Sequence, residues 1–177
     1  MTSTEPAPVT SPTVSLSGET SAAASEEGSE EASASNEPQP SETLIASGKC
    51  DLSDLLISAS TSQPSYGPGE IPLLYMTVKN PTDTDCVLDL EDGALRFEVY
   101  GMASNDRMWA DTDCYPSVEQ GRQEFPAGEE RGFDARWSKK GSAPGQCTNR
   151  AAVPAGAYYL HAVIEDNASD PAPFNLT

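Results

Sequence analysis

The stretch 153–164 constrains the fold more than any other part of this chain. It opens with a Pro154-x-Gly156 turn signal and continues as a run in which apolar and aromatic side chains alternate between two faces. One face carries Tyr158, Leu160, Ala162 and Ile164, and the other carries Tyr159, His161 and Val163. This alternation behind a marked turn predicts a central β-strand.

Tyr158 comes directly after this turn. Sandwich domains often carry a tyrosine at such a position, with its ring buried and its hydroxyl reaching back to the loop backbone. An ordinary core tyrosine is the other interpretation of the same residue.

Other segments alternate in the same way, and none shows a helical period. The predicted strands span residues 52–59, 70–79, 86–90, 94–100, 107–110, 131–137 and 172–176, besides the one within 153–164. Turn signals such as Asn80-Pro81 and Asp92-Gly93 separate them at intervals of about eight to twelve residues. The pattern predicts an all-β fold, an immunoglobulin-like antiparallel β-sandwich.

Residues 1–48 differ in composition from the rest of the chain. They are mainly Ser, Thr, Ala, Glu and Pro, and their charged residues are all glutamates. A segment so poor in large apolar residues cannot bury enough surface to offset its ordering entropy. We therefore predict a disordered acidic tether over 1–48, used as a spacer or as a recognition segment, and one folded domain over 49–177.

The charge of the chain restricts its partners. The formal net charge is -18, and residues 49–177 hold 10 basic and 20 acidic side chains. Because both parts are acidic, nucleic acid and an anionic membrane surface are not expected as partners, whereas a basic partner is compatible with the charge.

Four cysteines lie in the predicted domain, at Cys50, Cys86, Cys114 and Cys147. None of them shows the C-x-x-C spacing of a structural zinc site, so disulfides are the favoured interpretation. We predict the pairs Cys50–Cys86 and Cys114–Cys147. The first two cysteines flank predicted strands at one end of the sandwich, and the other two join neighbouring loops.

Disulfides predict an extracytoplasmic protein, secreted or anchored at the cell envelope. The residues after Met1 show neither the basic nor the apolar region of a signal peptide, and no window approaches the roughly 18 apolar residues of a membrane span. We expect a signal or anchor upstream of Met1, with membrane contact only through that anchor. A cytoplasmic protein with four free thiols is the alternative.

Residues suited to catalysis are scarce. His161 is the single histidine, and no G-x-S-x-G, H-E-x-x-H or phosphate-binding glycine loop occurs. Segments 83–86 and 111–114 both read Asp-Thr-Asp-Cys, but neither continues into the glycine and distal glutamate of a calcium loop. No catalytic residue, metal site or cofactor is therefore assigned, and an enzyme is not expected.

Arg107, Trp109 and Tyr115 are the candidate binding residues. Arg and Trp are enriched in binding hot spots, and a disulfide at Cys114 would hold the segment rigid and lower the ordering cost of binding. The same residue types also form the core and rim of irregular strands. Burial of Trp109 would remove it from such a surface.

Several turn and core motifs resemble those of a known family. They are Tyr66-x-Pro-Gly-Glu70, Val78-Lys-Asn80, Phe97-Glu-Val-Tyr100, Pro126-Ala-Gly-Glu129, Phe133-x-x-x-Trp137 and Pro154-x-Gly-x-Tyr158. This skeleton, over about residues 50–177, resembles the immunoglobulin-like domain of bacterial intracellular proteinase inhibitors. It is closer still to exported actinobacterial domains of unassigned function, which share the Arg107-x-Trp-x-x-x-Asp-Cys114 element and a cysteine in the Ser-Ala-Pro-Gly loop.

The sequence predicts two alternative functions. The first is a non-catalytic binding module of the bacterial cell envelope, whose partner is an envelope protein or a cell-wall component. The second, implied by the resemblance, is a proteinase inhibitor that inserts the exposed loop 138–146 into a protease cleft.

Overall fold

The computed structural model describes residues 50–177, in which almost every regular element is a β-strand. The strands are β1 (Leu56–Thr61), β2 (Ser65–Tyr66), β3 (Leu73–Lys79), β4 (Cys86–Leu90), β5 (Leu95–Gly101), β6 (Arg107–Ala110), β7 (Gly121–Phe125), β8 (Glu130–Arg136), β9 (Gly156–Ile164), β10 (Asn167–Ala168) and β11 (Ala172–Leu176). The helical turns within this range are η1 (Leu52–Asp54) and η2 (Asp111–Asp113). The all-β prediction is confirmed, whereas the predicted tether over 1–48 lies outside the described residues.

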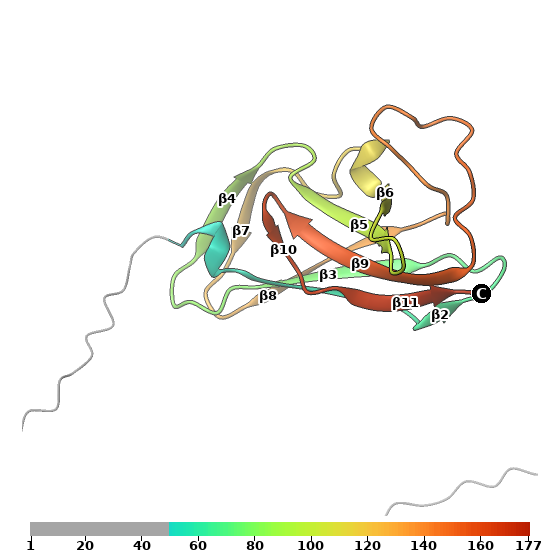
Figure 1. Cartoon of the computed structure of the whole chain (residues 1–177). Coiled ribbons are helices and arrows are strands. Elements are labelled where there is room, and N and C mark those ends of the chain that lie inside the picture. The colour runs from blue at the N-terminus through green and yellow to red at the C-terminus, as the bar shows by residue number, and fades with distance from the viewer. Residues whose placement is uncertain (1–49) are drawn as a thin grey trace, which may run out of the picture. The chain divides into compact units, whose positions relative to one another are not determined.

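The strands form two sheets that pack face to face as a sandwich (Figure 1). The smaller sheet has the order β1-β3-β8, and the larger has the order β2-β11-β9-β5-β6, with β10 also paired to β9. Every pairing is antiparallel except the short one between β2 and β11. A separate two-stranded ladder, β4-β7, extends one end of the domain. Within residues 50–177 no helix is long and apolar enough to span a membrane.

The predicted central strand is β9, which pairs with β5 on one side and with β11 and β10 on the other. Tyr158 is buried near the start of β9, and its hydroxyl donates a hydrogen bond of 2.5 Å to the carbonyl of Pro154. The interpretation of Tyr158 as a tyrosine tied back to its loop is therefore confirmed. This bond fixes the point at which the long loop after β8 enters the larger sheet.

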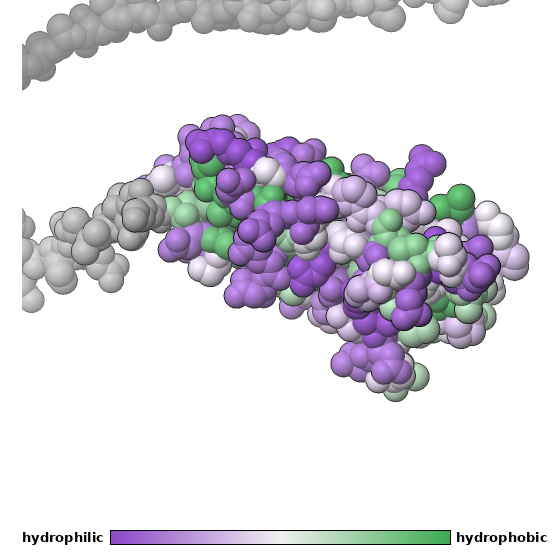
Figure 2. Space-filling model, turned by 90° about the horizontal axis from the view of Figure 1, so that it is seen from above, coloured by the Kyte–Doolittle hydropathy of each residue, from purple (hydrophilic) through white to green (hydrophobic). Residues whose placement is uncertain are grey.

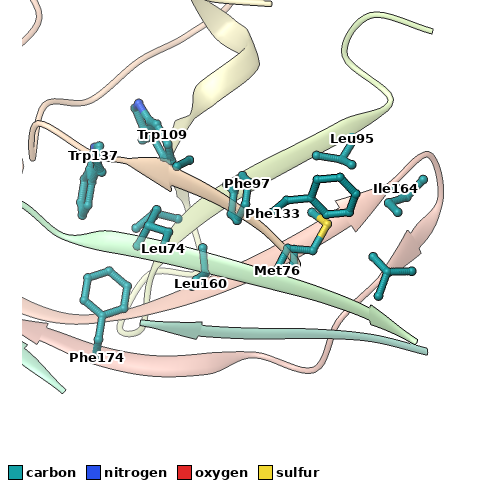
Figure 3. Close-up of a cluster of buried hydrophobic side chains, with 14 of the residues drawn as sticks. Leu74, Met76, Leu95, Phe97, Trp109, Phe133, Trp137, Leu160, Ile164 and Phe174 are labelled. Atoms are coloured by element: carbon teal, nitrogen blue, oxygen red, sulfur yellow. The ribbon is translucent and has the colours of Figure 1, made fainter. Parts of the chain in front are cut away.

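Alternation along the strands separates the core from the surface. Apolar side chains point inward from both sheets, while hydrophilic residues dominate the outer face, broken by separate hydrophobic areas (Figure 2). The core residues that face one another in Figure 3 include Leu74 and Met76 from β3, Phe133 from β8, Leu95 and Phe97 from β5, and Leu160 and Ile164 from β9. Burial of these apolar side chains is the main favourable contribution to folding.

Several elements differ from the sequence prediction in their bounds or were not predicted as strands. The first strand begins at Leu56 rather than residue 52, because the Asp54 carboxylate accepts the backbone N–H of Asp51 at 2.8 Å and stabilises the turn η1. The short strand β2 lies between the first two predicted strands, where no strand was predicted. Strand β7 was not predicted, since its inward position Gln123 is polar and interrupts the apolar alternation.

Both predicted disulfides are present. Cys50 pairs with Cys86 and Cys114 with Cys147, with Cα–Cα distances of 5.0 and 5.5 Å. All four cysteines are therefore committed to disulfides, so neither free thiols nor a four-cysteine zinc site forms. Two disulfides in a small β domain are typical of an oxidising, extracytoplasmic environment.

Candidate binding site

A hollow of about 490 Å³ lies between strand β8 and the segment that follows β6. We call it the β8 pocket. Its lining residues are Trp109, Asp111, Tyr115, Pro116, Val118, Asp134, Ala135, Arg136, Ser138 and Arg150. Small-molecule and peptide side-chain sites usually have volumes of about 300–1,000 Å³, so the β8 pocket is large enough for a specific ligand.

The rim of the β8 pocket exposes apolar surface. Tyr115 is 64% exposed and Val118 is 41% exposed, which makes them two of the six large hydrophobic residues that residues 50–177 leave at the surface. Because these two residues line one pocket, they present a shared apolar surface to a ligand.

Contacts on both sides of Tyr115 fix this rim in place. On one side, the Cys114–Cys147 disulfide joins the segment to the loop after β8, and the Ser142 hydroxyl donates to Asp113 Oδ2 at 2.6 Å. On the other side, Ser117 N–H donates to Asp92 Oδ1 at 2.9 Å. A rim that is held in this way loses little conformational entropy when a ligand binds.

Asp111 lies beneath the rim and is only 7% exposed. Its Oδ1 accepts the backbone N–H of Phe97 at 2.9 Å, which extends the β5-β6 ladder past the last residue of β6. Its Oδ2 is buried without a hydrogen-bond partner in the described part of the chain. Burial raises the pKa of this carboxyl to about 6, because desolvation disfavours the charged form more than the backbone hydrogen bonds favour it.

Two arginines, Arg136 and Arg150, also line the pocket, and Arg136 borders a second hollow beside Ser62, Ile71 and Leu73 as well. Neither forms an ion pair with a carboxylate of residues 50–177, although Lys79, Arg96 and Arg107 all do. Arg122, Lys139 and Lys140 also lack an ion pair within this range, and Asp111 and Asp134 line the same pocket. Because neither Arg136 nor Arg150 is neutralised by an ion pair within residues 50–177, both are available to a negatively charged group of a ligand.

The prediction that Trp109 forms a binding surface is wrong, because this residue is only 4% exposed. Its ring packs against Trp137 in the core, with the ring centroids 5.8 Å apart (Figure 3). The cause is a β-bulge between β5 and β6: Val99 pairs with Trp109, but Tyr100 pairs with Arg107. Met108 is the extra residue, so Arg107 and Trp109 point to opposite faces of the sheet although they are two residues apart.

Arg107 does not reach the β8 pocket either. Its guanidinium lies on the outer face of the larger sheet, where it contacts Asp113 Oδ1 at 3.0 Å and Glu98 Oε1 at 3.7 Å. The three candidate binding residues are thus not brought together. Of the three, only Tyr115 is largely exposed, and only a small part of Trp109 can contribute to the pocket wall.

Sequence reasoning missed the charged and polar part of the pocket. Asp134 and Arg136 lie at outward positions of a predicted strand, so the alternation predicted their exposure. It did not predict that the segment carrying Tyr115 would lie beside them. Arg150 follows an irregular loop and carries no local signal of a site. Only the fold brings these residues beside Tyr115.

The loop expected to serve as an inhibitor is largely attached to the domain. Ser142 N–H donates to the Met108 carbonyl at 3.0 Å, and its hydroxyl accepts the N–H of Ala110 at the same distance. Exposed residues are confined to Ser138, Lys140 and the turn 144–146 next to Cys147. Little of this loop is free to enter a protease cleft.

Comparison with known proteins finds no matching family model and no matching curated protein. Distant likenesses exist among solved structures. The alkylpurine DNA glycosylase AlkC of Pseudomonas fluorescens, bound to DNA containing an abasic site analog, is 13% identical over 70% of this chain and 30% of its own, with a TM-score of 0.44. A β-glucosidase of Listeria innocua in complex with glucose is 12% identical over 69% of this chain and 16% of its own, with a TM-score of 0.41.

The sporulation control protein Spo0M of Bacillus subtilis is 12% identical over 70% of this chain and 49% of its own, with a TM-score of 0.36. This chain spans less than half the length of each of these three proteins. Likenesses this distant carry no argument about function. The motif resemblance to proteinase inhibitor domains stays a prediction.

Proposed function

We propose that this protein is a non-catalytic binding module of the bacterial cell envelope and that the β8 pocket is its binding site. The observation that carries the proposal is the exposed apolar rim of Tyr115 and Val118, held beside the pocket by the Cys114–Cys147 disulfide. Binding to a rigid rim costs little conformational entropy, and burial of its apolar surface by a partner contributes favourably to the binding free energy.

The chemistry of the pocket supports binding rather than turnover. Its lining offers hydroxyls at Ser138 and Tyr115 and carboxylates at Asp111 and Asp134, but Ser138 makes no hydrogen bond to a base within residues 50–177. A nucleophile without an adjacent base is poorly activated. The pocket is instead suited to recognise a ligand through contact area and charge.

The proposed location rests on the two disulfides and the acidic N-terminal segment. Disulfides persist outside the cytoplasm, and a spacer rich in Ser, Thr, Ala, Glu and Pro provides distance from an anchor. The proposed partner is an envelope protein or a cell-wall component. Proteinase inhibition through the loop 138–146 is less well supported, because Ser142 attaches the middle of that loop to β6.

The experiment compares two double variants that remove similar exposed apolar surface. The test variant is Tyr115→Ser with Val118→Ser. The control is Leu56→Ser with Val87→Ser, whose wild-type residues are 58% and 40% exposed, close to the 64% and 41% of the rim pair. Both should fold, since solvent-exposed substitutions usually change stability by only about 0.5 kcal/mol.

Each protein is immobilised and used to capture partners from envelope extracts of the organism that encodes it. We expect wild type and the control to retain one shared partner intact, and the rim variant to lose it. Equal recovery by both double variants would exclude the β8 pocket as the site. Recovery of a chemically altered partner by purified wild type would exclude a non-catalytic role.

A further inference from the structure

Strand β8 forms the edge of the smaller sheet, and its unpaired side borders the β8 pocket. Its hydrogen bonds to β3 follow from the two bonds that flank the ladder: Trp137 N–H donates to the Pro72 carbonyl at 3.1 Å, and Asn80 N–H donates to the Glu129 carbonyl at 3.0 Å. In an antiparallel ladder every second residue bonds to the neighbouring strand. The odd-numbered residues of β8 are therefore bonded to β3.

The even-numbered residues Gly132, Asp134 and Arg136 direct their backbone N–H and C=O groups away from β3. Within residues 50–177 no hydrogen bond reaches these groups from the other side. An edge of this kind is a template for one more strand.

The free edge lies in a groove and is not fully open to solvent. A second hollow of about 210 Å³, lined by Val118, Glu119, Gly132, Phe133 and Asp134, shares Val118 and Asp134 with the β8 pocket. The two hollows are therefore neighbours along β8, and their linings include residues from Gly132 to Ser138. Gly132 lacks a side chain, which permits close approach of another backbone at this point.

We propose that an extended peptide segment of the partner adds as a strand to the free edge of β8, with a carboxylate of the peptide beside Arg136 and Arg150. This inference rests on the proposed function, because it names the chemistry that the same pocket recognises. Main-chain hydrogen bonds to Gly132, Asp134 and Arg136 supply affinity, and the pocket supplies specificity.

The peptide carboxylate must lie beside Arg136 and Arg150 and away from Asp111 and Asp134, which line the same pocket. Guanidinium groups bind carboxylates through paired, charge-assisted hydrogen bonds, and Arg136 and Arg150 have no carboxylate partner within residues 50–177. An apolar side chain of the peptide covers Tyr115 and Val118 at the rim. The carboxylate has two possible sources, the C-terminus of the peptide or an acidic side chain within it.

The strand direction distinguishes these two sources. Because β8 runs toward Arg136, a peptide whose C-terminus meets Arg136 pairs parallel to β8, whereas a peptide with an internal acidic residue can pair in either direction. The probes are therefore two randomised pentapeptide pools with acetylated N-termini. One pool has free C-termini, and the other is amidated with a fixed central glutamate.

The full-length protein is incubated with each pool at millimolar total concentration, and backbone amide exchange is followed by NMR. In free protein we expect Gly132, Asp134 and Arg136 to exchange rapidly, while Phe133 and Ala135 are protected by their bonds to β3. At least one pool should slow exchange at the three even positions. No protection by either pool, or protection by an oligosaccharide probe such as chitotriose alone, would overturn the inference.

Two variants test the hydrogen bonds and the charges separately. Asp134→Pro removes a free-edge N–H and leaves the β3 ladder intact, because this N–H is not bonded to β3. Its control is Ala59→Pro on the other edge strand of this sheet, β1. Ser62 N–H donates to the Leu73 carbonyl, so the even-numbered residues of β1 are bonded to β3 and the N–H of Ala59 is not. We expect the first variant to weaken binding of the selected peptide at least about tenfold and the control to leave it unchanged.

The double substitution Arg136→Gln with Arg150→Gln should also weaken binding, by about ten- to a hundredfold, and the loss should shrink at high salt.

Equal affinity of wild type, Asp134→Pro and Ala59→Pro would reject strand addition. If the pools fail but the rim substitutions still abolish capture of the envelope partner, strand addition is wrong and the proposed function stands. If the pools bind at β8 but the rim substitutions do not change capture of the envelope partner, the peptide site stands and the proposed partner interface is wrong.

Discussion

At the scale of single residues, Asp111 links the stability of the domain to pH. Its folded-state pKa is raised to about 6 from 3.8, because burial penalises the carboxylate. The folded state therefore binds the proton more tightly than the unfolded state does. The stability that Asp111 contributes is fully present below about pH 3.8 and is lost as the pH rises through about 6.

The variant Asp111→Asn should remove this pH dependence. Asparagine keeps an oxygen to accept the Phe97 N–H, and its amide nitrogen takes the place of the unpaired Oδ2. Between about pH 3.5 and pH 7.5 we expect the free energy of unfolding of the variant to rise relative to wild type by up to about 3 kcal/mol. Urea unfolding followed by tryptophan fluorescence measures the difference. Asp89→Asn, at an exposed aspartate, is the control. The expectation is contradicted if the stability difference between Asp111→Asn and wild type does not change with pH.

Tyr158 allows the contribution of one partly buried hydrogen bond, in the loop that precedes β9, to the stability of the domain to be measured. Tyr158→Phe keeps the ring in the core but leaves the Pro154 carbonyl without its donor. We expect a loss of about 1–2 kcal/mol in the free energy of unfolding. Tyr159→Phe is the matched control, because the Tyr159 hydroxyl makes no hydrogen bond within the described range. Equal stabilities of the two variants in urea unfolding would show that the bond contributes nothing.

At the scale of elements, the strands could be predicted from sequence because alternation and turn residues act locally. Strands β4, β6 and β11 have the bounds that the sequence predicts. Strand β7 could not be found in this way, since Gln123 satisfies its inward amide by donating to the Gln120 carbonyl at 2.9 Å. A buried polar residue with a local partner breaks the pattern without breaking the strand.

The candidate site was less predictable because it depends on pairing between distant segments. The extra residue Met108 reverses the faces of Arg107 and Trp109, and a bulge of this kind depends on the register with β5. Arg136 and Arg150 line one pocket with Tyr115 only once β8 and the loop behind it lie beside the segment after β6. The exposure of Tyr115 was predictable, because this residue follows a disulfide cysteine and no strand periodicity places it in the core; its role in binding stays a prediction.

The two disulfides close chain segments of similar length, 36 and 33 residues, yet they should differ in effect. Replacing either pair with serine should lower the free energy of unfolding by roughly 3–4 kcal/mol on the chain-entropy model. Cys86 is fully buried, so Cys50→Ser with Cys86→Ser should cost more, because a serine hydroxyl is then buried in the core.

Only Cys114→Ser with Cys147→Ser should affect the binding site. Amide exchange across 111–118 should accelerate in this variant, and capture of the partner should weaken, while the Cys50 and Cys86 variant keeps both properties. Both proteins are compared well below their unfolding transitions. Unchanged exchange across 111–118 would show that Ser117 and Asp113 hold the rim without the disulfide.

At the scale of the whole molecule, electrostatic repulsion opposes folding. The chain carries a net charge of -18, and the described residues form five ion pairs. Two of these pairs share Glu98, and most of their side chains are partly exposed. Exposed ion pairs contribute about 0–1 kcal/mol each, whereas a large excess of one charge destabilises the compact state over longer distances.

Added salt should therefore stabilise the folded protein, although it weakens the individual ion pairs. Raising NaCl from about 0.01 M to about 0.3 M shortens the Debye length from roughly 30 Å to less than about 10 Å, so repulsion among the unpaired carboxylates falls most. We expect the free energy of unfolding at neutral pH to rise by about 1 kcal/mol, and KCl to have the same effect. The increase should shrink near about pH 4, where many carboxylates are protonated in both states. Destabilisation by both salts at neutral pH would mean that the ion pairs around Glu98 and Arg107 outweigh the net charge of the chain.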